Sequence, residues 1–100
     1  MSRFLVTYHG SGMPDDPELM EQAKAAFVAW VAEAGDAIVD PGAPLHMVTQ
    51  VSSGSASTPV EVGGYSIIQA DSPDGAVAVL KSHPYVARGG TLQVNQVMEV

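Results

Sequence analysis

Two segments of this chain begin with the same helix-start pattern, and their positions restrict the fold more than any other feature. The triplets are Asp16-Pro17-Glu18 and Ser72-Pro73-Asp74. Asp16 and Ser72 can each accept backbone N–H groups as an N-cap, and proline suits the first helical position because it lacks an N–H. Each triplet follows a strand-like stretch, so the chain contains two strand-then-helix units.

The first helix is predicted over residues 17–34 and ends at Gly35, a suitable residue for a left-handed C-terminal position. Seven apolar residues share one face of it at helical spacing: Leu19, Ala23, Ala26, Phe27, Trp30, Val31 and Ala34. The second helix is predicted to run to about Ser82, with Ala76, Val77 and Leu80 inward. His83-Pro84 ends it, because the residue before proline avoids the α region.

Four strands are predicted around these helices. Residues 4–9 alternate, with Phe4, Val6 and Tyr8 on one face and Leu5, Thr7 and His9 on the other, before a turn at 10–12. The second strand is predicted as two pieces, 37–40 and 45–51, broken by Pro41-Gly42-Ala43-Pro44. The third covers 60–70, and the fourth covers 91–99 with Leu92, Val94 and Met98 on one side. Residues 52–59 are rich in Ser, Gly and Thr and are predicted to form a mobile loop.

The order β-α-β-β-α-β predicts an α+β domain over residues 1–100 with a ferredoxin-like, four-stranded antiparallel sheet. Both helices are expected on one face of the sheet, which leaves the other face uncovered. Only 15% of the residues are charged, so part of the outer surface is expected to be apolar and covered by another copy. We therefore predict a homodimer that packs sheet to sheet.

The net charge of −7 excludes several partners. Four lysines and arginines stand against eleven acidic residues, too few to neutralise a run of phosphates, so nucleic acid is not expected. An anionic membrane surface would be repelled for the same reason. The chain has no cysteine, no secretory leader pattern and no long apolar run, so a cytoplasmic protein is the expectation.

Two segments are similar to ones in the YCII-related family. The first is 64–76, where a Gly-aromatic strand leads through an acidic residue into a short helix, and the second is 83–90, with its His-Pro and Gly-Gly turn. The resemblance implies a dimeric α+β barrel. Some members of that family are thought to use a His–Asp pair whose histidine lies on the first long helix. Residues 17–34 contain no histidine, and the family's Asp-Gly-Pro-Phe signature is replaced by residues 52–59.

Three residues are candidates for catalysis: His9, Asp40 and His83. Histidine titrates near neutrality and can serve as a general base, which Asp40 would orient. Each has a structural alternative. His83 stands next to a helix C-terminus, where a positive charge is favourable, and Asp40 can cap the turn at Pro41-Gly42 through its own carboxylate. His9 lies on the strand face opposite Phe4 and Val6.

Four further residues are candidates for ligand binding: His46, Tyr65, Tyr85 and Arg88. Tyr65 follows Gly63-Gly64, where a ligand or another backbone can approach closely, and the last two flank the exit of the second helix. The three histidines lack metal-ligand spacing, so no metal site is predicted. The sequence has no Gly-rich phosphate loop either, and no cofactor is predicted.

These residues support two hypotheses. The first is a small enzyme that carries out cofactor-independent proton transfer or elimination on a small molecule in the dimer cleft. The second is a non-catalytic ligand-binding or accessory module on the same fold, which the missing helix histidine favours.

Overall fold

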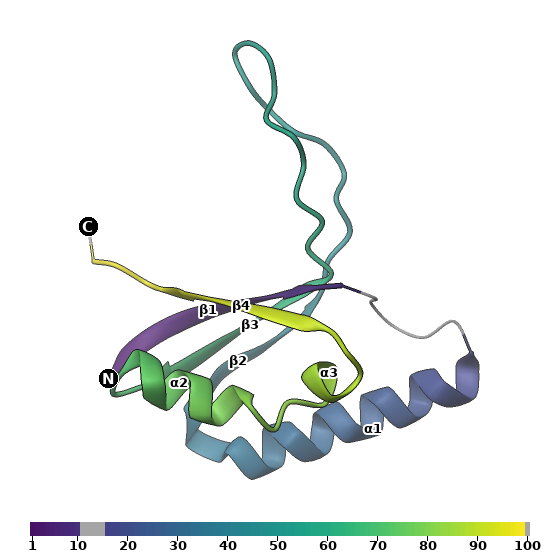
Figure 1. Cartoon of the computed structure of the whole chain (residues 1–100), viewed down its shortest axis with the longest axis vertical. Helices are drawn as coiled ribbons and strands as arrows, with labels where there is room; N and C mark the ends of the chain where they lie inside the picture. Colours follow the sequence, from purple (N-terminus) through teal and green to yellow (C-terminus); the bar gives the residue numbers. More distant parts are fainter. Residues whose placement is uncertain (11–15, 100) are drawn as a thin grey trace.

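The computed structural model describes residues 1–10 and 16–99. Its elements are, in order, β1 (Ser2–His9), α1 (Pro17–Ala34), the 3₁₀ turn η1 (Gly35–Ala37), β2 (Ile38–Pro44), β3 (Gly64–Ala70), α2 (Pro73–Leu80), α3 (Pro84–Ala87) and β4 (Thr91–Gln96). Figure 1 shows a single sheet with the helices on one side and a long excursion of the chain on the other. This excursion, residues 45–63, is called the arm below.

The sheet has the predicted βαββαβ topology. Its strand order is β2-β3-β1-β4, and every neighbouring pair is antiparallel. Val6 of β1 lies opposite Ser66 of β3 and Val94 of β4, so these three side chains share the face that the helices cover. The opposite face carries Leu5, Thr7 and their neighbours and is not covered by any helix (Figure 1).

Both predicted helix starts are confirmed. The backbone N–H of Glu18 donates to Asp16 Oδ1 at 2.8 Å, and that of Gly75 donates to Ser72 Oγ at 3.0 Å. Each cap satisfies a donor that the first helical turn leaves without an intrahelical partner. Gly35 follows α1 with φ +56°, as expected for a residue with a positive φ at a helix end.

The core lies between the sheet and the inner sides of α1 and α2. It is formed by Phe4, Val6, Trp30, Ile68, Ala70, Ala76 and Leu80. The predicted apolar face of α1 is only partly buried, because Leu19 and Ala26 are exposed, and Val77 of α2 is exposed as well. Helical spacing predicted which side of each helix faces the sheet, but it predicted too many buried residues on that side. The sheet covers only a narrow strip of each helix.

The second strand differs from the prediction. It is continuous from Ile38 to Pro44 through the proline-glycine pair, and residues 45–51 form no strand. Two register shifts between β2 and β3 allow the strand to continue through Pro41, which has no N–H to donate to the sheet. Gly42 adopts φ +79° at this bulge. Beyond Pro44 the chain has no partner strand, because β3 begins only at Gly64 rather than at Val60. The alternating residues 45–51 therefore leave the sheet as one side of the arm.

The C-terminal third also differs from the prediction in two places. The second helix ends at Leu80, and a separate short helix, α3, follows His83. Strand β4 ends at Gln96, so Met98 lies beyond it with 74% of its surface exposed. The turn predicted at 10–12 falls mainly on residues outside the described part. Within the described ranges, no helix combines the length and the apolar content needed to cross a membrane.

The bulge at Gly42 yields a stability prediction. A Cβ on Gly42 would lie 1.7 Å from the backbone oxygen of Tyr65, and the positive φ is unfavourable for any L-residue with a side chain. We expect Gly42→Ala to lower the free energy of unfolding by more than about 2 kcal/mol, measured by urea denaturation. Gly54→Ala in the arm is the control, because a Cβ there meets nothing within 4 Å. Equal stabilities of the two variants would contradict this account of the bulge.

Candidate functional site

A pocket of about 420 Å³ lies on the helix-covered side of the sheet, between α1, the junction of β2 and β3 with the arm, and α3. Its walls are largely apolar. It is lined by Tyr8, Ala23, Lys24, Phe27, Val28, Pro41, Gly42, Ala43, Pro44, Gly63, Gly64, Tyr65, His83, Pro84, Tyr85 and Arg88. Pockets of this size accommodate small organic molecules.

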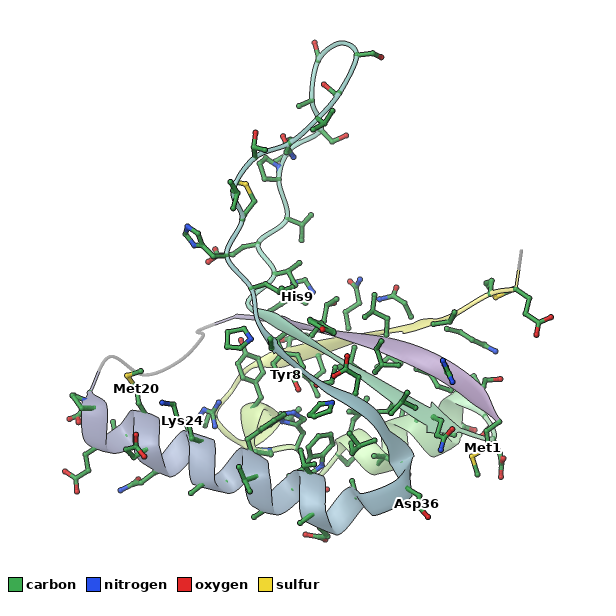
Figure 2. All side chains as sticks on the ribbon, turned by 180° about the vertical axis from the view of Figure 1, so that it is seen from behind. Met1, Tyr8, His9, Met20, Lys24 and Asp36 are labelled. Atoms are coloured by element: carbon green, nitrogen blue, oxygen red, sulfur yellow. The ribbon has the colours of Figure 1, made fainter. Side chains whose placement is uncertain are left out.

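A chain of partly to fully buried hydrogen bonds forms one side of the pocket. Tyr8 Oη lies 2.8 Å from His83 Nε2 and 2.7 Å from Ser66 Oγ, and Ser66 Oγ donates to the carbonyl oxygen of Pro41 at 2.8 Å. At the other end, the backbone N–H of Tyr85 donates to His83 Nδ1 at 3.0 Å. These contacts connect β1, β2, β3 and α3 through side chains. Figure 2 shows Tyr8 in the space between the sheet and α1.

The two ends of this chain fix the direction of every hydrogen bond in it. The Tyr85 N–H can only donate, so His83 Nδ1 carries no proton and Nε2 carries it in the neutral ring. The Pro41 carbonyl can only accept, so the Ser66 hydroxyl donates to it and receives a hydrogen bond from Tyr8. Tyr8 Oη therefore accepts from His83 Nε2–H and donates to Ser66.

The surroundings of His83 keep its ring neutral. The residue is only 2% exposed, and its ring lies 4.3 Å from that of Trp30 and 5.1 Å from that of Tyr8, measured between centroids. Burial lowers the pKa of His83 to about 4, and the positive charge of Arg88 acts in the same direction. Burial also raises the pKa of Tyr8, partly offset by its hydrogen bond with Ser66, so the phenol keeps its proton at neutral pH.

The position of His83 overturns one sequence-based interpretation. His83 is the N-cap of α3, with Pro84 at the first helical position, and it does not stabilise the end of α2 as a cation. An imidazolium could not accept the Tyr85 N–H, because both of its nitrogens would carry protons.

Gly90 leaves room for the ring of Tyr85, since a Cβ at position 90 would lie 2.2 Å from that ring.

Two positively charged side chains, Lys24 and Arg88, line the pocket. The guanidinium of Arg88 lies 5.5 Å from the centroid of the Tyr85 ring. Lys24, on α1, points its side chain into solvent with 60% of it exposed and approaches Glu21 at 3.9 Å. Among the residues that the structure describes, no aspartate or glutamate lines the pocket. Nor do the described residues include a group of three or more side chains able to hold a metal ion.

The structure places four of the seven predicted site residues at the pocket: Tyr65, His83, Tyr85 and Arg88. The other three, His9, Asp40 and His46, do not line it. His46 is exposed on the arm. His9 is on the uncovered face, where its Nδ1–H donates to the carbonyl oxygen of Glu61 at 3.0 Å and its Nε2 accepts from Thr7 Oγ1 at 2.8 Å.

Asp40 has the capping role that its position before Pro41-Gly42 suggested. Its Oδ1 accepts the backbone N–H of Gly42 at 2.8 Å, and its Oδ2 receives a longer hydrogen bond of 3.4 Å from the Tyr65 hydroxyl. No hydrogen bond joins Asp40 to a histidine in the described part of the chain. The His–Asp pair considered from the sequence is therefore not assembled within one protomer.

Sequence reasoning missed Tyr8, Ser66 and Lys24 as site residues. A signal was present for the first two, because strand alternation places both on the inward face among Phe4, Val6 and Ile68. A polar side chain at such a position needs a hydrogen-bond partner. The identity of that partner, His83, was not available from the sequence, since 75 residues separate it from Tyr8.

Comparison with known proteins supports the fold. No protein-family model matches the chain, and no curated protein sequence matches it. Among solved structures, the chain is similar to the 5-chloro-2-hydroxyhydroquinone dehydrochlorinase TftG from Burkholderia phenoliruptrix AC1100, determined in complex with 2,5-dihydroxybenzoquinone. The two chains are 18% identical over 91% of this chain and 90% of the other, with a TM-score of 0.56. This similarity confirms the predicted α+β fold of the dimeric α+β barrel type.

The neutral state of His83 predicts a specific pH dependence of stability. A histidine whose folded pKa lies below its unfolded value of about 6.5 stabilises the fold above pH 6.5 and loses that contribution as the pH falls toward 4. His83→Asn retains an N-cap acceptor but cannot titrate. We expect the wild-type free energy of unfolding to fall more steeply between pH 6.5 and 4 than that of His83→Asn, by at most about 3 kcal/mol.

Urea denaturation at a series of pH values measures these slopes, and the comparison holds even where the variant is less stable overall. His46→Asn, at an exposed position on the arm, serves as the control and should keep the wild-type slope. Parallel curves for wild type and His83→Asn would show that His83 is not held neutral.

Proposed function

We propose that this chain binds a small ring-shaped molecule in the pocket and catalyses a cofactor-independent elimination or proton transfer on it. The observation that carries the proposal is the Tyr8–His83 pair, a hydrogen-bonded phenol and imidazole on the wall of an apolar pocket. The similar fold of a dehydrochlorinase with a bound dihydroxybenzoquinone supports this class of reaction. The resemblance to the YCII-related family points to the same fold.

In this proposal Tyr8 is the proton donor and His83 is its positioning residue. Without a ligand the Tyr8 O–H donates to Ser66, and it turns from Ser66 to the substrate to give up its proton. The raised pKa of Tyr8 keeps the phenol protonated and so suits an acid better than a base. His83 Nε2–H already points at the phenol oxygen and would stabilise a negative charge there after proton transfer. His83 is a poor base, because its one unprotonated nitrogen accepts the Tyr85 N–H.

The reaction can be written without an oxidant or a cofactor. For an ionised, hydroxylated ring that carries a leaving group, Tyr8 gives its proton to the ring carbon bearing that group, and a C–H bond forms. The bond to the leaving group then breaks, and the group departs with the electron pair. In the same step a second ring hydroxyl gives its proton to the Tyr8 oxygen and its O–H electron pair to the ring, so the ring becomes a quinone. The ionised ring thereby loses X⁻, which is loss of HX counted from the neutral molecule.

The alternative is a non-catalytic module that binds a small molecule in the same pocket. Two observations favour it: α1 carries no histidine, and no histidine–carboxylate pair forms among the described residues. His9 and Asp40 remain candidates for catalysis on the uncovered face, where a second copy of the chain would have to complete the site.

Chloride release from 5-chloro-2-hydroxyhydroquinone tests the enzyme proposal. We expect turnover by the wild type and a loss of at least about 100-fold in Tyr8→Phe, which keeps the ring but not the proton. Ser82→Ala removes an exposed hydroxyl far from Tyr8 along the chain and outside the pocket lining, and should leave turnover unchanged. Full activity in Tyr8→Phe would exclude Tyr8 as the acid, and binding without chloride release by the wild type would support the alternative.

We further propose that the chain is a homodimer in which the uncovered sheet faces pack together and each arm contacts the other copy. The arm rises from the uncovered side of the sheet in both views (Figures 1 and 2), into the space that a second sheet would occupy. It exposes five large apolar side chains: Leu45, Met47, Val48, Val51 and Val60. Glu61 is its one charged residue. Seven acidic side chains, by contrast, lie exposed on or beside the helices, at Asp16, Glu18, Glu21, Glu33, Asp36, Asp71 and Asp74. Each copy carries a net charge of −7, so the repulsion between two copies is weakest when the sides that bear the arms face each other.

Sedimentation velocity tests the dimer. We expect the wild type to sediment as a dimer at micromolar concentration and the double variant Val48→Asp/Val51→Asp to sediment as a monomer, because four carboxylates would be brought into the interface. Val77→Asp, on the exposed side of α2, adds a charge outside this surface and should remain dimeric. A monomeric wild type would refute the proposal.

A further inference from the structure

The charged side chains that line the pocket are positive, whereas the chain as a whole is negative. The chain has eleven acidic residues and four lysines or arginines. Two of those four cations, Lys24 and Arg88, line the pocket, and no acidic side chain among the described residues does. A pocket with this lining attracts anions although the protein as a whole repels them.

Arg88 is available to a ligand. In the described part of the chain it has no ion pair with a carboxylate, and its guanidinium lies over the Tyr85 ring at 5.5 Å from the centroid. The aromatic face holds the guanidinium beside the pocket without neutralising its charge. Arginine also offers several N–H donors in one plane, which suits a carboxylate or two adjacent oxygens on a ring.

Lys24 lines the pocket from α1. Its only ion pair among the described residues is with Glu21, at 3.9 Å and largely exposed, and such surface pairs contribute little to stability. The lysine side chain can therefore turn toward a bound anion at little cost. Most of the other lining residues are apolar or aromatic, with Phe27, Val28 and Pro84 among them.

We propose that the pocket selects the anionic form of a small aromatic or quinonoid molecule, with Arg88 and Lys24 binding its ionised oxygens and the apolar walls binding its ring. This inference rests on the proposed function and specifies its substrate class. It also gives the two cations a role in the reaction, because a ring that arrives ionised needs no general base to remove its first proton. Tyr8 then faces an electron-rich ring as proton donor.

Binding of benzoate and of its neutral counterpart benzamide, measured by isothermal titration calorimetry on the full chain, tests the proposal. We expect benzoate to bind at least about tenfold more tightly than benzamide. Arg88→Gln and Lys24→Gln should each weaken benzoate binding about five- to tenfold and leave benzamide binding unchanged. Lys81→Gln removes the same charge at an exposed position outside the pocket and is the matched control.

The outcomes separate this inference from the function on which it rests. Equal affinities for benzoate and benzamide, or unchanged benzoate binding in both pocket variants, would overturn anion selection while leaving a small-molecule pocket in place. If neither probe binds to the wild type, both the pocket and its selectivity are refuted. Equal loss in Lys81→Gln would show that only the overall charge matters and would overturn the role of Arg88 and Lys24.

Discussion

The hydrogen-bonded chain from Tyr85 through His83, Tyr8 and Ser66 to Pro41 is the interaction on which the pocket depends. It joins three strands and the α3 turn through buried polar groups, and each group in it has a partner. Buried polar groups are costly unless they are paired, so this arrangement admits one geometry and excludes alternatives. Because the chain ends on a backbone donor and a backbone acceptor, it also fixes the tautomer of His83.

The position of the pocket follows from that constraint. His83 caps α3 and thereby sets where Tyr85 and Arg88 lie, while Tyr8 and Ser66 join this side of the pocket to the sheet. The bulge at Gly42 brings the Pro41 carbonyl onto Ser66, so an irregularity of the edge strand becomes part of the site. A regular second strand would not present this carbonyl at the same point, since the register shifts move it relative to β3.

The two faces of the sheet carry different chemistry. The helix-covered face holds the Tyr8–His83 pair and the cation-lined pocket, whereas the uncovered face holds His9 and, beside β3, the Asp40–Tyr65 contact. A site on the first face is complete within one protomer. In the proposed homodimer, any site on the second face would include residues of the copy that packs there.

The amino-acid pattern was sufficient for the order of the elements, the caps at Asp16 and Ser72 and the topology of the sheet, because these depend on short-range spacing and hydrogen bonding. It also indicated Tyr65, His83, Tyr85 and Arg88, from the turns around them, and these four residues line the pocket. It did not determine that residues 45–51 leave the sheet, since alternation alone cannot reveal that a strand lacks a partner. Nor did it reveal the neutral state of His83 or its pairing with Tyr8. Those properties come from burial against Trp30 and from contacts across 75 residues of sequence, which only the folded chain brings together.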